Sequence, residues 1–403
     1  MPYPLSLYWG LNSYNFFNIP ALSFGKIRMS YGTTGNDQIG DYQYLDSWAS
    51  AGFPYGGVSG LAPARVYNPD YGWEVNKKFE AAIDLGFMDD KLLISAGYYN
   101  NRSSNQLVGY TLSSQSGFTE YTANLPAKVQ NSGVEIDISS TNVNNGNFQW
   151  NTSFNMSIPK NKLLSYPGLE SSSDAASYEV GQSIRMIKGY HFTGVDPATG
   201  NPMFLDVNKD GFYTEDDDYI VIGQTMPKFF GGLSNTISYK NLTLDIFFQF
   251  VKQEAPLLDY GPLVGTIGSR INKTTDVLGY WNGYGEQTEI PRPTTTTTED
   301  AYKLFRNQYR YSDAAWGDAS YIRLKNVAIS YDLSKLTQAW KMQGTTIYVQ
   351  GENLVTFTKY KGLDPEINGF DRRFVYPINP FGSVKSPKLP VLRTLTIGLK
   401  FSL

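Results

Sequence analysis

Apolar and polar side chains alternate along the last stretch of the chain, 393–403 (RTLTIGLKFSL). One face holds the apolar residues Leu395, Ile397, Leu399, Phe401 and Leu403, and the other holds Thr394, Thr396, Gly398, Lys400 and Ser402. A period of two residues predicts a β-strand with one apolar and one polar face. About ten residues is also the length that a tilted strand needs to cross a bilayer's hydrocarbon core. The pattern is typical of an outer-membrane barrel, although an edge strand of a soluble β-sandwich shows the same alternation.

The same alternation predicts further strands along the chain, about ten in total. The stretches are 25–33, 75–87, 92–98, 134–139, 148–158, 233–239, 242–250, 321–333 and the region around Ile347 and Val349. The polar face of 148–158 holds neutral amides and hydroxyls, which suit a water-filled lumen better than a dry core. In 321–333 the alternation of apolar and polar positions shifts by one residue between Leu324 and Val327, which predicts a β-bulge there.

The connections between these strands alternate between short and long. Short turns are expected near residues 88, 145, 240 and 339, the last of them helical, and long loops at about 33–71, 101–127, 159–230, 252–317 and 350–389. Short periplasmic turns and long extracellular loops are the layout of bacterial outer-membrane barrels. We therefore predict an all-β fold: an antiparallel transmembrane β-barrel wall of about ten strands with long extracellular loops. An open sheet edge cannot stand in lipid, so the wall must close, and ten strands could close on themselves as a small barrel. The long loops and the lack of a signal sequence fit better with the carboxyl-terminal part of a larger barrel.

Composition supports this prediction and excludes several classes of protein. Aromatic residues make up 15% of the 403 residues, which fits the aromatic girdles of a barrel. A net charge of −3 gives no footprint for nucleic acid, and a mean hydropathy of −0.34 excludes a helical membrane protein. There is no Cys and only one His, His191, so disulfides, a multi-His zinc site and a His-dependent triad are excluded.

The amino end, MPYPLSLYWG, has no basic segment, no long apolar segment and no cleavage site of an export signal. We expect residues 1–23 to be an irregular lead-in and residues 24–403 to form the barrel portion. A chain bound for the outer membrane needs such a signal, so this chain is expected to be either part of a longer protein or not exported.

Several ordered blocks of sequence between about Asn12 and Leu403 resemble one protein family. They are SYGTTGNDQIGDYQYLDSW (30–48), FEAAIDLGFMDDKLLISAGYYNNRSSNQL (79–107), NLPAKVQNSGVEIDI (124–138), DVNKDG (206–211), DASYIRLKNVAISYDL (318–333), GENLVTFTKYKGLDPE (351–366) and LPVLRTLTIGLKFSL (389–403). These blocks resemble the SusC/RagA family of TonB-dependent outer-membrane transporters.

The resemblance implies a location in the outer membrane of a Bacteroidota-type bacterium and import of glycans, or of peptides as the second choice. It implies three partners besides the membrane lipids: a SusD-like surface lipoprotein, the TonB complex and an oligosaccharide or peptide substrate. The family's plug domain, its TonB box and about half of its barrel have no counterpart here, so we expect the chain alone to be incompetent for transport. Two other interpretations stay open, a soluble or surface-displayed β-rich carbohydrate-binding protein and a passive porin.

One loop follows the calcium-binding pattern of an EF-hand. Oxygen donors occupy positions one, three and five, a glycine (Gly211) occupies position six, and a carboxylate occupies position twelve. The predicted ligands are Asp206, Asn208, Asp210, the backbone carbonyl of Phe212, and Asp217. The alternative is a solvated acidic turn. We expect bound Ca²⁺ to stiffen an extracellular loop and to have no catalytic role.

Aromatic residues of the predicted loops are candidates for stacking on sugar rings, and the alternative for each is simple loop packing. The candidates are Tyr42, Trp48, Trp281, Tyr284, Tyr311 and Trp316. Cationic residues such as Lys26, Arg28, Arg323 and Lys325 are expected to line the lumen. The neighbouring acids 216–218 could suggest a glycosidase, which uses two acids at a fixed separation. They lie in one turn beside the calcium pattern, so we predict that the protein is not an enzyme.

Overall fold

The computed structural model describes most of the chain. The described residues are 5–10, 21–36, 44–50, 52, 56–68, 70–111, 115, 118, 120–172, 174–175, 177–257, 272–273, 275–340, 342–366 and 390–402.

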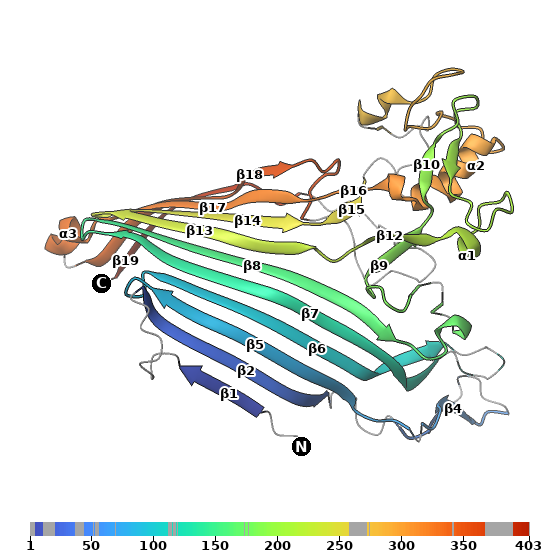
Figure 1. The fold of residues 1–403 in the computed structure, drawn as a ribbon, viewed down its shortest axis with the longest axis horizontal. Helices are drawn as coiled ribbons and strands as arrows, with labels where there is room; N and C mark the ends of the chain where they lie inside the picture. Colours follow the sequence, from blue (N-terminus) through green and yellow to red (C-terminus); the bar gives the residue numbers. More distant parts are fainter. Residues whose placement is uncertain are drawn as a thin grey trace.

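One large antiparallel sheet dominates the described residues, and its neighbouring strands follow one another in sequence order (Figure 1). Its eleven strands are β1 (Leu5–Gly10), β2 (Leu22–Asn36), β5 (Glu74–Phe87), β6 (Leu92–Thr111), β7 (Glu120–Asn144), β8 (Phe148–Ser165), β13 (Phe229–Tyr239), β14 (Leu242–Lys252), β17 (Tyr321–Asp332), β18 (Gln343–Thr358) and β19 (Thr394–Ser402). The predicted all-β antiparallel wall is thus confirmed. The structure differs from the expectation in β1, which lies within the 1–23 segment predicted to be irregular. Its alternation of Leu5, Leu7 and Trp9 is only six residues long and was too short to be recognised by its pattern.

The register of the sheet joins the apolar positions of neighbouring strands into one continuous band. One row across seven strands consists of Ile397, Val349, Ile329, Leu244, Ile237, Trp150 and Val143. The apolar side chains of β19 are not covered by a second layer, since Leu395 and Ile397 are 78% and 77% exposed. An apolar band of this extent in water would be an aggregation hazard, whereas in a bilayer it is the lipid-facing surface.

The opposite face of the same strands is polar. The row that neighbours the one above consists of Thr396, Gln350, Ala328, Asp245, Thr236, Asn151 and Thr141. Its members bond to residues on the next strand: the Thr236 hydroxyl donates to Asp245 at 2.6 Å, and the Gln350 amide donates to Asn326 at 2.9 Å. This face has the chemistry of a hydrated lumen.

Connections are sorted by length between the two ends of the sheet, as predicted (Figure 1). At one end, the β5–β6 turn has Met88, Asp89 and Asp90 at positive φ, Gly146 lies at φ 83° between β7 and β8, and Lys240 lies at φ 53° between β13 and β14. The helix α3 (Ser334–Thr337) and a 3₁₀ turn (Gln338–Trp340) join β17 to β18 at the same end. The smaller elements of the long connections gather at the opposite end.

The loop predicted at 101–127 was wrong, because β6 continues to Thr111 and β7 already begins at Glu120. Polar residues such as Asn101 and Ser103 suggested a loop, but they pair with Asn131 and Val129 on β7. β8 likewise extends to Ser165, beyond the predicted strand end. Above the hydrocarbon layer neither face of a strand needs apolar side chains, so the two-residue pattern fades where the strands leave the membrane. The bulge predicted between Leu324 and Val327 is confirmed at Lys325.

Four short strand pairs and one longer helix lie in the long connections. The pairs are β3 (Ser47–Ser50) with β4 (Leu61–Arg65), β9 (Met186–Gly189) with β12 (Ile220–Gln224), β10 (Phe192–Val195) with β11 (Pro202–Phe204), and β15 (Glu254–Pro256) with β16 (Trp316–Asp318). The helices are α1 (Glu215–Asp218) and α2 (Asp300–Asn307), with 3₁₀ turns at Leu169–Ser171, Thr275–Gly279, Tyr309–Tyr311 and Asp313–Ala315.

Candidate functional site

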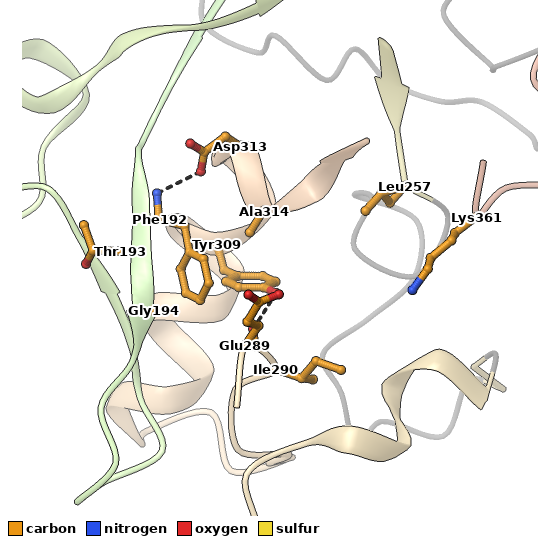
Figure 2. A pocket seen from close by; sticks show the side chains of 10 residues that line it. All are labelled: Phe192, Thr193, Gly194, Leu257, Glu289, Ile290, Tyr309, Asp313, Ala314 and Lys361. Carbon is orange, nitrogen blue, oxygen red and sulfur yellow. Dashed lines mark hydrogen bonds between the residues drawn. The ribbon is translucent and has the colours of Figure 1, made fainter. Parts of the chain in front are cut away.

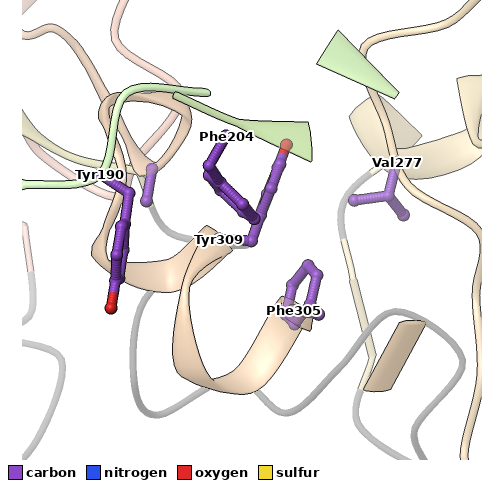
Figure 3. Packing of buried hydrophobic residues seen from close by; sticks show 6 residues of the cluster. Tyr190, Phe204, Val277, Phe305 and Tyr309 are labelled. Atoms are coloured by element: carbon purple, nitrogen blue, oxygen red, sulfur yellow. The ribbon is translucent and has the colours of Figure 1, made fainter. Parts of the chain in front are cut away.

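The β8–β13 and β14–β17 connections fold against each other around a small apolar core. Its buried members are Tyr190, Phe204, Val277, Phe305, Tyr309 and Ala315 (Figure 3). Helix α2 turns Ala301 and Phe305, four residues apart, to the same buried side. Because side chains from both connections share one core, we define residues 186–224 and 275–318 as the loop unit of the protein.

Aromatic rings hold this core together. The Tyr309 ring stacks on Phe305 with centroids 5.1 Å apart and meets the Phe192 ring edge to face, also at 5.1 Å. Tyr190 meets Tyr219 edge to face at 4.7 Å, and burial raises the pKa of both hydroxyls well above the ordinary value, with the Glu215 carboxylate adding to the effect. Edge-to-face and offset contacts of this kind each contribute about 0.5–1.5 kcal/mol beyond area burial. The loop unit is therefore built to keep a fixed shape.

A cavity of about 560 Å³ opens beside this core (Figure 2). Its lining residues come from β10, from the segments before and after α2, and from two segments next to the large sheet: Phe192, Thr193, Gly194, Leu257, Glu289, Ile290, Tyr309, Asp313, Ala314 and Lys361. Apolar side chains form much of its wall, while two carboxylates and one ammonium group supply charge. This mixture and this size are those of a small-ligand site, for which volumes of about 300–1,000 Å³ are usual.

Asp313 fixes one wall of the cavity to β10. One oxygen of its carboxylate accepts the backbone N–H of Phe192 at 2.8 Å, and the other lies 2.6 Å from Nδ1 of His191. The backbone of Tyr190 also donates to the carbonyl of Tyr311 at 3.0 Å. With both oxygens of Asp313 occupied, this acid is a structural tie of the wall.

A network of charged side chains anchors the opposite wall to the lumen face of the sheet. Arg323 on β17 donates to Thr356, Asp364 and Glu366, and Lys325 donates to both oxygens of Glu366 at 2.8 Å. Burial raises the pKa of Asp364, but the hydrogen bonds from Arg323 and from two backbone N–H groups outweigh it, so the pKa is lowered overall. The segment that carries Lys361 is thereby held against the top of β17, and Arg323 and Lys325 lie on the lumen face, as expected.

The predicted calcium loop is ordered by hydrogen bonds to its own carboxylates. Asp206 accepts the N–H groups of Lys209, Asp210 and Gly211, and Asp210 accepts that of Phe212. The loop is closed by the buried Asp218, which accepts the N–H groups of Val207 and Thr214. Asp217 only accepts the hydroxyl of Thr214, at 3.2 Å. Among the described residues no group of three or more acids or histidines has converged into a metal-binding cluster, so the calcium site stays a prediction.

The aromatic candidates are not gathered at one place. Trp48 lies on β3 with its side chain exposed, and Tyr284 is 87% exposed on the loop after Thr275–Gly279. Trp281 donates to the carbonyl of Pro197, while Tyr311 and Trp316 pack against the apolar core of the loop unit. Tyr42 lies outside the described residues. None of the five described candidates lines the cavity, and their role in stacking on sugars stays a prediction.

Sequence reasoning missed the residues that do line the cavity. Phe192, Leu257, Glu289 and Lys361 are up to about 170 residues apart and lie in long connections without a regular pattern. No spacing signal marks them. The one local hint is the helical spacing of Ala301, Phe305 and Tyr309, which predicts an amphipathic helix in this connection but not the cavity beside it.

The chain is similar in sequence to curated proteins and similar in fold to solved structures. No family model matches the chain. The chain is 30% identical over 421 residues to the TonB-dependent receptor P3 of Formosa agariphila, which covers 97% of this chain and 40% of that protein. It is 24% identical over 402 residues to the TonB-dependent receptor SusC of Bacteroides thetaiotaomicron, with 91% and 38% covered. The chain thus spans about 40% of the length of the curated relatives it matches.

Solved structures show the same fold. The RagAB peptide importer in its open-open state matches with a TM-score of 0.75 at 23% identity, covering 91% of this chain and 40% of that one, and the structure of the RagAB peptide transporter gives 0.74 at 24% identity. The solved structures confirm the predicted fold, and the likeness to the curated TonB-dependent receptors confirms the predicted outer-membrane location. In the described residues, no helix has the length and apolar character needed to span a membrane.

Proposed function

We propose that this chain, which belongs to the TonB-dependent receptors of the SusC/RagA type, is part of the barrel of an active importer in the outer membrane. The single observation that supports this best is the two-faced sheet: an exposed apolar band on one side, a polar surface on the other, and the bulky connections at one end only. A wall of this kind separates lipid from a hydrated passage.

The imported solute in this proposal is a short oligomer, either a glycan or a peptide. The glycan choice rests on the likeness to SusC, and the peptide choice is favoured by the likeness of the fold to the RagAB peptide importer. The cavity of the loop unit supports a role for this unit in meeting the solute, because it lies among the connections at the loop-bearing end of the sheet.

The proposal includes two partners. A SusD-like surface lipoprotein would cover the loop-bearing end, and the TonB complex would supply energy through a plug domain. The relatives' names support the second partner directly, since they are TonB-dependent receptors. We assign no catalytic reaction to the protein, because the relatives are receptors and importers.

Calcium binding by the loop from Asp206 to Asp217 is a secondary proposal. Its support is the order of donors in the sequence and the turn in which Asp206 accepts three backbone N–H groups. The loop is closed by Asp218, and the predicted ligand Asp217 accepts only the hydroxyl of Thr214. An ion there would stiffen the loop unit and take no part in transport chemistry.

Energised uptake tests the proposed function. The full-length receptor is expressed with its signal and plug in a bacterial host with or without a working TonB, and uptake of radiolabelled oligosaccharides and peptides is measured. We expect uptake of at least one probe that disappears without TonB. Uptake that persists without TonB would instead indicate a passive porin. A chain that folds in water without detergent and shows no heat-dependent gel migration would indicate the soluble carbohydrate-binding alternative.

A further inference from the structure

Tyr309, one of the two aromatic residues that line the cavity of the loop unit, is not available as a stacking platform. Tyr309 is only 2% exposed, because one face of its ring is stacked on Phe305 and its other contacts include the edge-to-face ring of Phe192. A sugar ring binds an aromatic residue by lying on an open face of its π-system. With Tyr309 covered, only the half-buried ring of Phe192 remains for stacking on a sugar ring.

The remaining wall favours an apolar group of modest size. Leu257, Ile290 and Ala314 line the cavity together with Phe192 (Figure 2). These side chains are half-buried, so an apolar guest would cover carbon surface that now faces solvent. Burial of this kind is favourable by about 25 cal/mol for each Å² removed from water.

The charged residues of the cavity lining determine which polar group of a ligand can bind beside its apolar group. Glu289 is exposed at the cavity, and Lys361 enters from the opposite wall (Figure 2). The tie formed by Asp313 adds a second negative charge, so the lining carries two acids and one base. An ammonium group near Glu289 would gain a charge-assisted hydrogen bond, which is stronger than one between neutral groups. The hydroxyl groups of a neutral glycan can also donate to Glu289, but they bring no positive charge to it.

We propose that this cavity binds the amino-terminal end of a peptide, with an apolar side chain against Leu257 and Ile290 and the terminal ammonium group at Glu289. The inference rests on the proposed import function and names its substrate class.

Calorimetry on the full-length receptor in detergent tests this inference. The probes are trileucine with a free amino terminus, the same peptide with an acetylated amino terminus, and maltohexaose. We expect the free peptide to bind, and acetylation to weaken its binding about tenfold, as expected for the loss of one charged hydrogen bond. Glu289→Gln should weaken the free peptide by a similar factor and leave the acetylated peptide unchanged.

Two further variants complete the test. Ile290→Trp narrows the apolar side of the cavity and should weaken the binding of both peptides, while Glu179→Gln, an exposed acid of the β8–β13 connection that does not line the cavity, should change nothing. Glu289→Gln alters only an exposed side chain, so its result stands even if Ile290→Trp fails to fold. Peptide binding that ignores both cavity variants, no peptide binding, or maltohexaose binding that is lost in Ile290→Trp would each overturn the inference. TonB-dependent uptake of maltohexaose that the cavity variants leave unchanged would overturn it while the proposed function still stands.

Discussion

The guanidinium of Arg323 donates to the carboxylate of Asp364 at 2.7 Å, and the two side chains are 2% and 4% exposed. Arg323 belongs to β17, whereas Asp364 lies in the segment after β18, 41 residues later. Asp364 also accepts the backbone N–H groups of Glu366 and Val391. One buried pair therefore joins the lumen face of the wall to both ends of the described β18–β19 connection.

Breaking this pair should destabilise the protein strongly. Asp364→Asn removes one of the two carboxylates to which the buried guanidinium donates and leaves Glu366 as the other, so the expected cost is about 1.5–3 kcal/mol, that of a lost hydrogen bond to a charged group. A folded barrel migrates faster in a gel than the heat-unfolded chain. The expected result is that the full-length receptor in detergent loses this faster migration at a lower temperature. Lys303→Ala is the control, because its pair with Asp300 is exposed and spans 3.7 Å, so its loss should cost well under about 1 kcal/mol.

A double variant shows whether Arg323 and Asp364 stabilise the protein as an ion pair or only through independent packing contacts. Arg323→Met with Asp364→Leu removes both charges, so it should be less harmful than the sum of the two single changes. Equal and additive losses would show that Arg323 and Asp364 act independently.

The strands could be predicted from the sequence, and the Arg323–Asp364 pair could not. Residues such as Ile397 and Thr396 reveal their faces by alternation alone, because a strand has only two faces and lipid demands an apolar one. Arg323 meets Asp364 only because the described residues that follow β18 turn toward the lumen face of β17, and no local pattern encodes that turn. The cavity has the same origin, since Phe192 and Lys361 meet through two independent connections. The part of β6 beyond Asn101 was missed for a different reason. The strand continues there, but its side chains no longer alternate between apolar and polar.

Asp318 should make the stability of the contact between β16 and the large sheet decrease in strong acid. Burial acts to raise its pKa, but hydrogen bonds from Lys252 and Ser320 outweigh burial and lower the pKa from 3.8 to about 2. A carboxylate with a lowered pKa in the folded state stabilises that state above the ordinary pKa, and this contribution is lost as the pH falls toward about 2. The stability difference between the wild type and Asp318→Asn should thus be constant above about pH 5 and shrink between pH 4 and 2.

Tryptophan fluorescence of the full-length receptor in detergent measures this difference, because Trp316 lies two residues from Asp318 on β16. Lys252→Met should reduce the low-pH dependence, since it deletes the ammonium donor at 2.8 Å and leaves the hydrogen bonds from Ser320. A difference between wild type and Asp318→Asn that persists unchanged at pH 2 would contradict this assignment.

Gly133 on β7 should tolerate no side chain, because the ring of Tyr99 on the paired strand covers it. A Cβ atom at Gly133 would lie 2.6 Å from the Tyr99 hydroxyl oxygen. Gly133→Val is expected to displace the ring and to cost about 1–3 kcal/mol, as overpacking usually does. Gly97→Ala on β6 is the matched control, since its Cβ would meet nothing closer than 3.8 Å. The temperature at which each variant loses the faster gel migration of the folded barrel measures both changes. Equal temperatures for the two variants would refute the close fit of Tyr99 over Gly133.

The calcium proposal is tested by titration of the full-length receptor. Ca²⁺ binding at up to millimolar concentrations, lost in Asp210→Ala, is the expected result for a site of this extracellular kind. Asp218→Asn should weaken the loop with or without the ion, because this buried carboxylate accepts two backbone N–H groups. The absence of any calorimetric signal at millimolar Ca²⁺ would end the proposal and leave a solvated acidic turn.

Two neighbouring residues on β19 test the orientation of the whole wall. Ile397 lies in the apolar row with Val349 of β18, and Thr396 lies in the polar row with Gln350. If the apolar row faces lipid, Ile397→Arg buries a charge in hydrocarbon and should destabilise the full-length barrel by about 2–4 kcal/mol near the midplane. Thr396→Arg places the same side chain on the same strand but in the hydrated lumen, so it should be almost neutral. Unfolding by urea of the receptor reconstituted in lipid vesicles measures both changes. Equal effects of the two substitutions, or a larger effect of Thr396→Arg, would mean that the lipid-facing side has been assigned wrongly, and the importer proposal would fail with it.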